Sequence, residues 1–245
     1  MKMNIKPAFR YQFDVFFKGS AITFLVIMAA IAALMVTSIY ISADTTTISF
    51  TGYGITAVIF LFIMGIVNIR SDLRLCLQYG VSRRTSFVSE ILAVLSVSAI
   101  LAAAGELLTG IAQAFSAGNS QFLIADLYQL IYVGPDAVSL SFGQHILSML
   151  LNTSLTFCAC LFGMFFSLMF WRLNKVWTVV AAISIPVLIN VVPILLSRLG
   201  INLILLINWI GASPFNFVLF FLLLAALFGA VNWLLLRRAN IKEAK

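Results

Sequence analysis

The chain has 245 residues, of which 62% are hydrophobic and only 9% are charged, and it carries a formal net charge of +7. A water-soluble domain has about 25% charged residues because its surface faces water, so this composition excludes an ordinary soluble fold. With three cysteines and one histidine, neither a disulfide framework nor a metal centre is expected.

Long apolar segments predict an all-α, polytopic membrane protein of about six transmembrane helices. The predicted spans cover residues 20–41, 52–69, 86–105, 144–170, 176–197 and 214–236. Pro186 and Pro193 are expected to kink the fifth span, and Pro214 is well placed at the start of the sixth. No internal repeat is visible in the sequence.

The positions of the basic residues predict the orientation. All of the 15 Lys and Arg residues except Arg198 fall on one side of the predicted spans. Since Lys and Arg accumulate on the cytoplasmic side, both termini, including the basic tail 237–245, are expected in the cytoplasm. We therefore expect a multi-pass protein of a cell membrane, with a bacterial plasma membrane favoured, and no nucleic-acid binding.

The residues before the first span predict an amphipathic helix. Aromatic residues recur at helical spacing, and charged residues occupy another face; they are Phe9, Phe13, Phe16 and Phe17, and Arg10, Asp14 and Lys18. This pattern is typical of a helix that lies in the membrane interface, so residues 1–19 are interpreted as a cytoplasmic interface helix. The alternative is a simple basic flank of the first span.

The connection between the second and third spans predicts a short cytoplasmic helix. Leu73, Leu77 and Val81 recur every fourth residue and form an apolar stripe. Gly80 can end this helix, because glycine tolerates the left-handed conformation of a helix cap, and Ser82 can cap the next helix. The alternative is an ordinary inner loop that is basic only because of its side of the membrane.

This arrangement resembles the permease subunits of type-2 ATP-binding cassette exporters. The resemblance rests on the amphipathic N-terminal helix, the six spans, the short helix after the second span and the sequence Gly-Val-Ser-Arg-Arg that follows it. It implies that the short helix is a coupling helix, which seats in a groove of an ATPase subunit. The residues that it assigns to coupling are Asp72, Leu73, Arg74, Leu77, Gly80, Val81, Ser82, Arg83 and Arg84.

The resemblance also implies a transport subunit that is not itself an enzyme. The sequence contains no phosphate-binding loop and no hydrolase or protease motif. No cofactor is expected in this chain, whereas ATP and Mg²⁺ are expected in a separate cytoplasmic ABC ATPase. A second permease chain, identical or similar, is expected to complete the pathway in the bilayer, with a hydrophobic drug, a lipid or an antimicrobial peptide as the substrate.

Three outer features complete the predictions. Glu106 adjoins the third span, where a charge is costly, and it is a candidate for substrate binding or gating, with an anchor at the outer boundary as the alternative. Residues 199–210 are interpreted as a re-entrant or interfacial piece, or as an extended end of the fifth span. The loop 116–142 suggests another interfacial helix.

Asparagines within the spans are expected to form hydrogen bonds between helices; these are Asn68, Asn152, Asn190, Asn216 and Asn232.

Two other functions remain open. One is the substrate-binding membrane component of a vitamin importer, which is also small, basic and six-spanning. The other is a non-transporting membrane scaffold or immunity protein. A gene for an ABC ATPase beside the gene for this chain would favour the exporter.

Overall fold

The computed structural model describes residues 5–40, 48–51, 54–118, 122–134, 140–172, 191, 198 and 203–237. The elements in these residues are α1 (Ile5–Tyr40), β1 (Ile48–Thr51), α2 (Gly54–Gln78), α3 (Arg83–Gly118), β2 (Phe122–Ala125), the π-helix η1 (Gln129–Val133), α4 (Phe142–Arg172), α6 (Leu203–Ala212) and α7 (Pro214–Arg237). Within this described part, five helices are long and apolar enough to cross a membrane: α1, α2, α3, α4 and α7. Helices suit a bilayer because each satisfies its own backbone hydrogen bonds.

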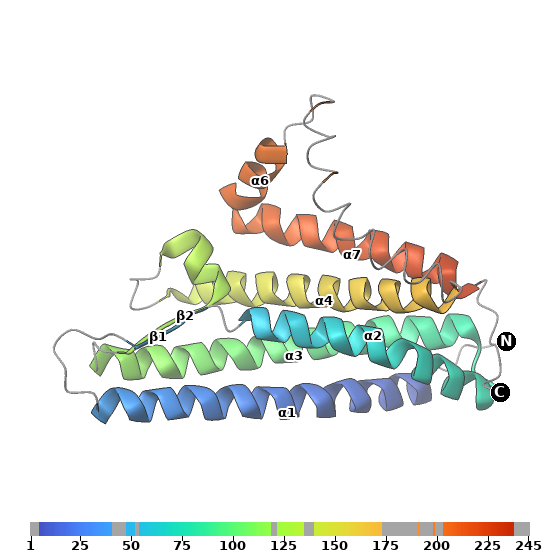
Figure 1. Ribbon diagram of the computed structural model, residues 1–245, viewed down its shortest axis with the longest axis horizontal. Coiled ribbons are helices and arrows are strands. Elements are labelled where there is room, and N and C mark those ends of the chain that lie inside the picture. Colours follow the sequence, from blue (N-terminus) through green and yellow to red (C-terminus); the bar gives the residue numbers. More distant parts are fainter. Residues whose placement is uncertain are drawn as a thin grey trace.

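The long helices lie side by side in one bundle (Figure 1). Helix α4 packs against α2, α3 and α7, and α1 packs against α3. Helix α1 begins and α7 ends at the same end of the bundle, where α2 also turns into α3, whereas both strands lie at the opposite end (Figure 1). We call these the inner end and the outer end, following the orientation that the basic residues predict.

Two consecutive parts of the chain have the same order of elements, helix–strand–helix. These are α1–β1–α2 and α3–β2–α4, and the two strands pair in parallel with the register Ile48↔Phe122 to Thr51↔Ala125. Because α1 packs on α3 and α2 packs on α4, the two units lie side by side and run in the same direction (Figure 1). The repeat is one of arrangement, and the sequence analysis did not detect it.

The strands correct the interpretation of the outer loop. Phe122 and Leu123 belong to β2 and not to a helix, whereas Leu130 and Ile131 do lie in the short helix η1. Each strand has only four residues, too few for a clear alternation of apolar and polar side chains. Pairing with a strand that is distant in the sequence decides their conformation.

The predicted interface helix at residues 1–19 is not a separate element, because α1 runs unbroken from Ile5 to Tyr40. Phe16 is fully buried in the core, whereas Phe17 is exposed. Gly19, where a break was expected, lies so close to α2 that a Cβ there would be 2.9 Å from the Met64 side chain. This close contact suits a continuous helix that packs along the bundle.

The predicted fourth and sixth spans fall within α4 and α7, the predicted second span coincides with α2 from Gly54 onward, and the third is extended by α3 to Gly118. The fifth predicted span, 176–197, lies outside the described residues apart from residue 191, so a count of six stays a prediction. The predicted segment 199–210 overlaps a separate ten-residue helix, α6, which ends at Ala212. A helix of this length measures about 15 Å and is too short to cross the hydrocarbon core.

Candidate functional sites

The inner turn between α2 and α3 is held by caps on both helices. Gly80 has a φ of +73°, and the amides of Gly80 and Val81 donate to the carbonyls of Leu77 and Cys76 over 3.0 and 2.9 Å. These are the two bonds of a Schellman C-cap. The Ser82 hydroxyl accepts from the Thr85 amide over 3.2 Å, as an N-cap does. Both predicted caps are therefore confirmed, and the turn is locally well determined.

The structure divides the predicted coupling residues into two groups. Exposed residues are Arg74, Gly80, Ser82 and Arg84, and half-buried ones are Leu77, Val81 and Arg83. Asp72 and Leu73 are both only 1% exposed and face the interior of the bundle. The apolar stripe thus packs largely within this chain and is not free for a partner.

The segment predicted to be a short separate helix is the last part of α2, since α2 runs without a break to Gln78. Leu73 belongs to the main core cluster, and Leu77 packs against it. Burial of the stripe in the bundle is the physical reason that the helix does not turn away along the membrane. The most exposed apolar side chain at the turn is instead Tyr79, at 79% exposure. Sequence analysis missed it because it lies outside the stripe.

The inner turn also contacts the end of α7. Arg83 donates from Nη1 to the backbone carbonyl of Arg237 over 3.2 Å. Close by, Gln12 of α1 donates to the Ser86 carbonyl and accepts from the Ser89 hydroxyl over 2.6 Å. The start of α3 is therefore held by both the first and the last long helix of the described chain.

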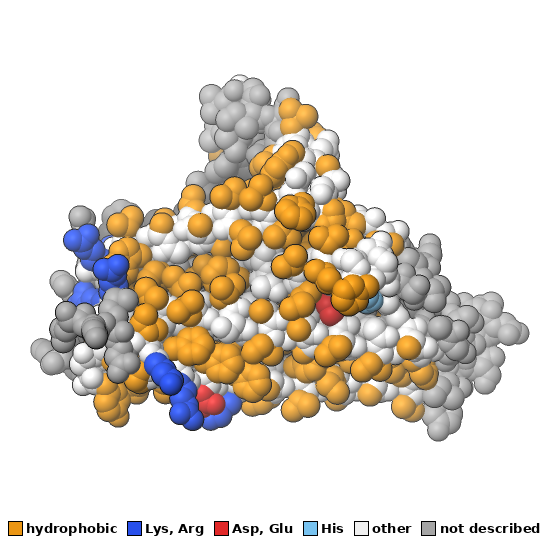
Figure 2. Space-filling model, turned by 180° about the vertical axis from the view of Figure 1, so that it is seen from behind, with side chains coloured by type: hydrophobic (Ala, Val, Ile, Leu, Met, Phe, Trp, Pro, Cys, Tyr) orange, Lys and Arg blue, Asp and Glu red, His pale blue; other side chains and the backbone are white. Residues whose placement is uncertain are grey.

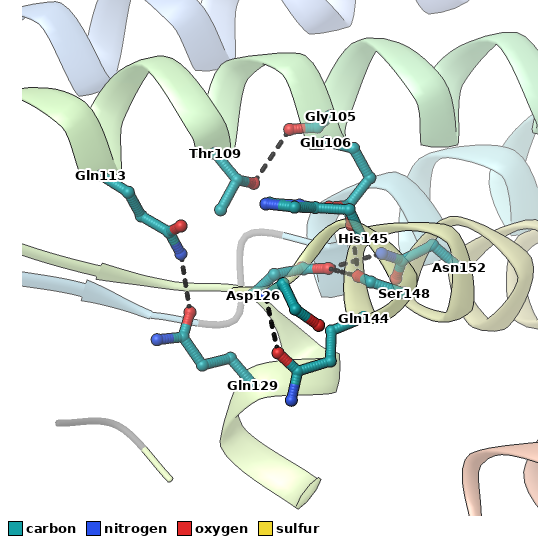
Figure 3. A network of polar contacts seen from close by, with 11 residues as sticks. Gly105, Glu106, Thr109, Gln113, Asp126, Gln129, Gln144, His145, Ser148 and Asn152 are labelled. Carbon is teal, nitrogen blue, oxygen red and sulfur yellow. Dashed lines mark hydrogen bonds and ion pairs between the residues drawn. The ribbon is translucent and has the colours of Figure 1, made fainter. Parts of the chain in front are cut away.

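The second site is a set of polar side chains near the outer end, which we call the outer polar cluster (Figure 3). It consists of Glu106, Thr109 and Gln113 on α3, Asp126 and Gln129 after α3, and His145, Ser148 and Asn152 on α4. On each helix the three residues have the spacing i, i+3, i+7, which puts them on one face. This double pattern is the signal by which the sequence analysis might have found the site.

Glu106 and its hydrogen-bond partners form the part of the outer polar cluster that lies nearest the surface. It is 9% exposed, and His145 lies with Nδ1 2.9 Å from Glu106 Oε2. Ser148 hydrogen-bonds to the other carboxyl oxygen, Oε1. When Nδ1 carries the ring proton of His145, both neighbours donate to Glu106.

Asp126 lies behind Glu106 and shares Ser148 with it. The Ser148 hydroxyl is 3.1 Å from Asp126 Oδ2, and the Asn152 amide donates to the same oxygen. A hydroxyl carries one hydrogen, so Ser148 cannot donate to two carboxylates at once.

The start of α2 closes the cluster from the other side. A Cβ at Gly54 would lie 2.8 Å from Asp126 Oδ1 and 3.2 Å from Asn152 Oδ1. Deeper in, Gln113 donates to Gln129 over 3.0 Å, and both side chains are buried. The cluster therefore joins α2, α3, α4 and the segment between α3 and α4.

A groove of about 670 Å³ opens beside Glu106 and His145. Its walls come from α3 and α4, and Glu106 and His145 are the only polar side chains that line it in the described part of the chain. Figure 2 shows a red carboxyl group and the pale blue ring of the one histidine among orange hydrophobic side chains. Glu106, the predicted outer site residue, thus lies in the wall of a groove.

Comparison with known proteins adds no relative: no family model, no curated protein and no solved structure matches this chain.

Proposed function

We propose that this chain is the membrane permease subunit of an ATP-driven exporter of the ATP-binding cassette type. The observation that supports the proposal most is the doubly capped inner turn. It joins two long apolar helices, α2 and α3, and it lies at the end of the bundle where the basic residues gather. Such a turn suits a surface that receives force from a separate ATPase.

The exposed side chains of the turn would form the docking surface. Arg74, Tyr79 and Arg84 are exposed there, whereas Asp72 and Leu73 are buried in the bundle. An exposed tyrosine beside arginines is typical of residues that dominate protein interfaces. The proposed contact surface is thus the tip of the turn and not the apolar stripe.

The turn is mechanically connected to the outer polar cluster. Helix α3 runs without interruption from Arg83 to Glu106 and beyond, and α2 begins at Gly54, against Asp126 and Asn152. A displacement of the turn would therefore shift both helices at the cluster as rigid elements. In this proposal ATP and Mg²⁺ bind in the ATPase, and two permease chains together enclose the pathway.

The test is co-purification with the ABC ATPase encoded beside the gene for this chain. Tyr79→Asp combined with Arg84→Glu removes the aromatic anchor and reverses a charge, and it leaves the apolar spans unchanged. We expect normal membrane insertion and a loss of ATPase recovery of about tenfold or more. Arg83 is left intact because it bonds to the end of α7.

The matched control is Lys18→Glu. Lys18 is also a basic residue, and it lies in the inner half of α1, away from the turn. Its side chain is 71% exposed. This variant should retain the ATPase. If the double variant retains the ATPase and transports at the parental rate, the turn is an ordinary basic connection, and a scaffold or immunity protein becomes the better proposal.

A further inference from the structure

The groove beside Glu106 has the composition of a binding site for an apolar cation. Three of the α3 residues that line the groove have small side chains, and they leave room for a ligand; these are Ala103, Gly110 and Ala114. A Cβ at Gly110 would have nothing within 4 Å, so there is open space above this residue. The volume of about 670 Å³ lies within the range of about 300–1,000 Å³ that is usual for small-molecule sites.

The rim of the groove is strongly apolar and exposed. Phe142 is 82% exposed, Leu107 70% and Ile111 67%. Lipid would cover such side chains, and a ligand could enter between them from the bilayer. The rim therefore favours a ligand that partitions into membranes.

The carboxyl group of Glu106 favours a ligand with a positive charge. Glu106 is the one acidic side chain that lines the groove in the described part of the chain, and its carboxyl group contacts His145 and Ser148. No Lys or Arg occurs anywhere between residues 84 and 172, so α3 and α4 offer no fixed positive charge to Glu106 at this end. An anion in an apolar wall is costly unless a cation pairs with it.

The described helices bring no Lys or Arg side chain to the groove. In the described residues, the outer halves of α1, α2 and α7, and all of α6, contain no Lys or Arg either. Arg198 is the one basic residue on the predicted outer side, and it does not line the groove. A cationic ligand would therefore add a positive charge beside Glu106 that these helices do not provide.

We infer that the groove between α3 and α4 binds a lipophilic cation, whose apolar body lies between the rim residues and whose positive charge pairs with Glu106. This inference rests on the proposed function, because it names the class of cargo that the permease would carry. It narrows the expected substrates to positively charged amphiphiles and excludes neutral and anionic lipids.

The test is a comparison of two ions of nearly the same size and opposite charge, tetraphenylphosphonium and tetraphenylborate. Their binding is measured on the full chain in lipid nanodiscs, as the excess over empty nanodiscs. The parent chain should bind the phosphonium and show no saturable binding of the borate. Glu106→Gln should weaken phosphonium binding about tenfold, the effect of losing roughly 1.4 kcal/mol.

Two glycine variants keep the test decisive if Glu106→Gln disturbs folding. Gly110→Leu fills the groove without a change in charge and should abolish phosphonium binding. Gly229→Leu places the same side chain on α7, where a Cβ also has nothing within 4 Å, and should leave binding unchanged. Equal binding of both ions by the parent, or unchanged phosphonium binding by Gly110→Leu, would overturn the inference.

The measurement needs no ATPase, so it separates the two proposals. Phosphonium binding by a chain that recovers no ATPase would support the groove and contradict the permease. Recovery of the ATPase by a chain without any preference for the phosphonium would do the opposite.

Discussion

At the residue scale, Ser148 is the centre of the outer polar cluster. Its hydroxyl contacts Glu106 and Asp126, and it is fully buried. Two carboxyl groups in a low-dielectric environment repel each other if both are charged. The Ser148 hydroxyl lies between the two groups and gives each of them a polar neighbour.

Replacement of Ser148 tests this role. Ser148→Ala removes a polar contact of two buried carboxyl groups, and we expect a loss of roughly 1–3 kcal/mol in the free energy of unfolding, measured by denaturant titration in mixed micelles. Ser154→Ala is the matched control on the same helix, because within the described residues the Ser154 hydroxyl donates to the Leu151 carbonyl of α4 itself and not to another element. Equal losses for the two variants would contradict a special role for Ser148.

At the element scale, α2 and α4 owe their close approach to two glycines. A Cβ at Gly65 would overlap the carbonyl oxygen of Cys160, and a Cβ at Gly163 would overlap that of Phe62. Small residues let helix backbones come together in membranes, where van der Waals packing replaces the hydrophobic effect between helices. Below this crossing, Arg70 donates to the Ser167 carbonyl over 2.6 Å.

The close approach of α2 and α4 predicts that two glycine-to-alanine variants change the free energy of unfolding in opposite directions. Gly163→Ala should lower the free energy of unfolding by about 1–3 kcal/mol through overpacking. Gly229→Ala on α7 meets open space and should raise it slightly, because alanine favours a helix over glycine by about 1 kcal/mol. A stabilising effect of Gly163→Ala, measured in the same micelles, would mean that α2 and α4 are farther apart.

At the scale of the whole molecule, the bundle has two chemically different ends. The inner end carries exposed arginines around the turn, and the outer end contains strands, buried amides and carboxyl groups. This asymmetry has the direction that the positive-inside rule requires of a membrane protein whose α2–α3 turn is cytoplasmic.

Cysteine labelling tests this orientation. In intact cells, Ser141→Cys at the outer end should react with a membrane-impermeant maleimide, whereas Gln78→Cys at the inner turn should react only after permeabilisation. Both positions are exposed. The three native cysteines are buried, so the parent chain serves as the background. Labelling of Gln78→Cys in intact cells would reverse the orientation and remove the basis for ATPase docking at the turn.

Interhelical hydrogen bonds show how far the sequence could be interpreted. The predicted role of Asn232 is confirmed, since it donates to the Leu161 carbonyl of α4 over 2.8 Å. Asn68 instead contacts the Met64 sulfur within its own helix, and Asn190 lies outside the described residues. Residue type indicates that a buried amide needs a partner, but the rotation of each helix decides which partner it finds.

Three features could be predicted from the amino-acid sequence: the long apolar helices, the asymmetry of basic charge, and the caps at Gly80 and Ser82. These features depend on hydropathy or on backbone conformation within a few residues. Four others became visible only in the folded chain: α1 continues through Gly19, Leu73 and Asp72 face inward, β1 pairs with β2, and Glu106 meets His145 and Ser148. These four depend on contacts between residues far apart in the chain, which no local pattern specifies.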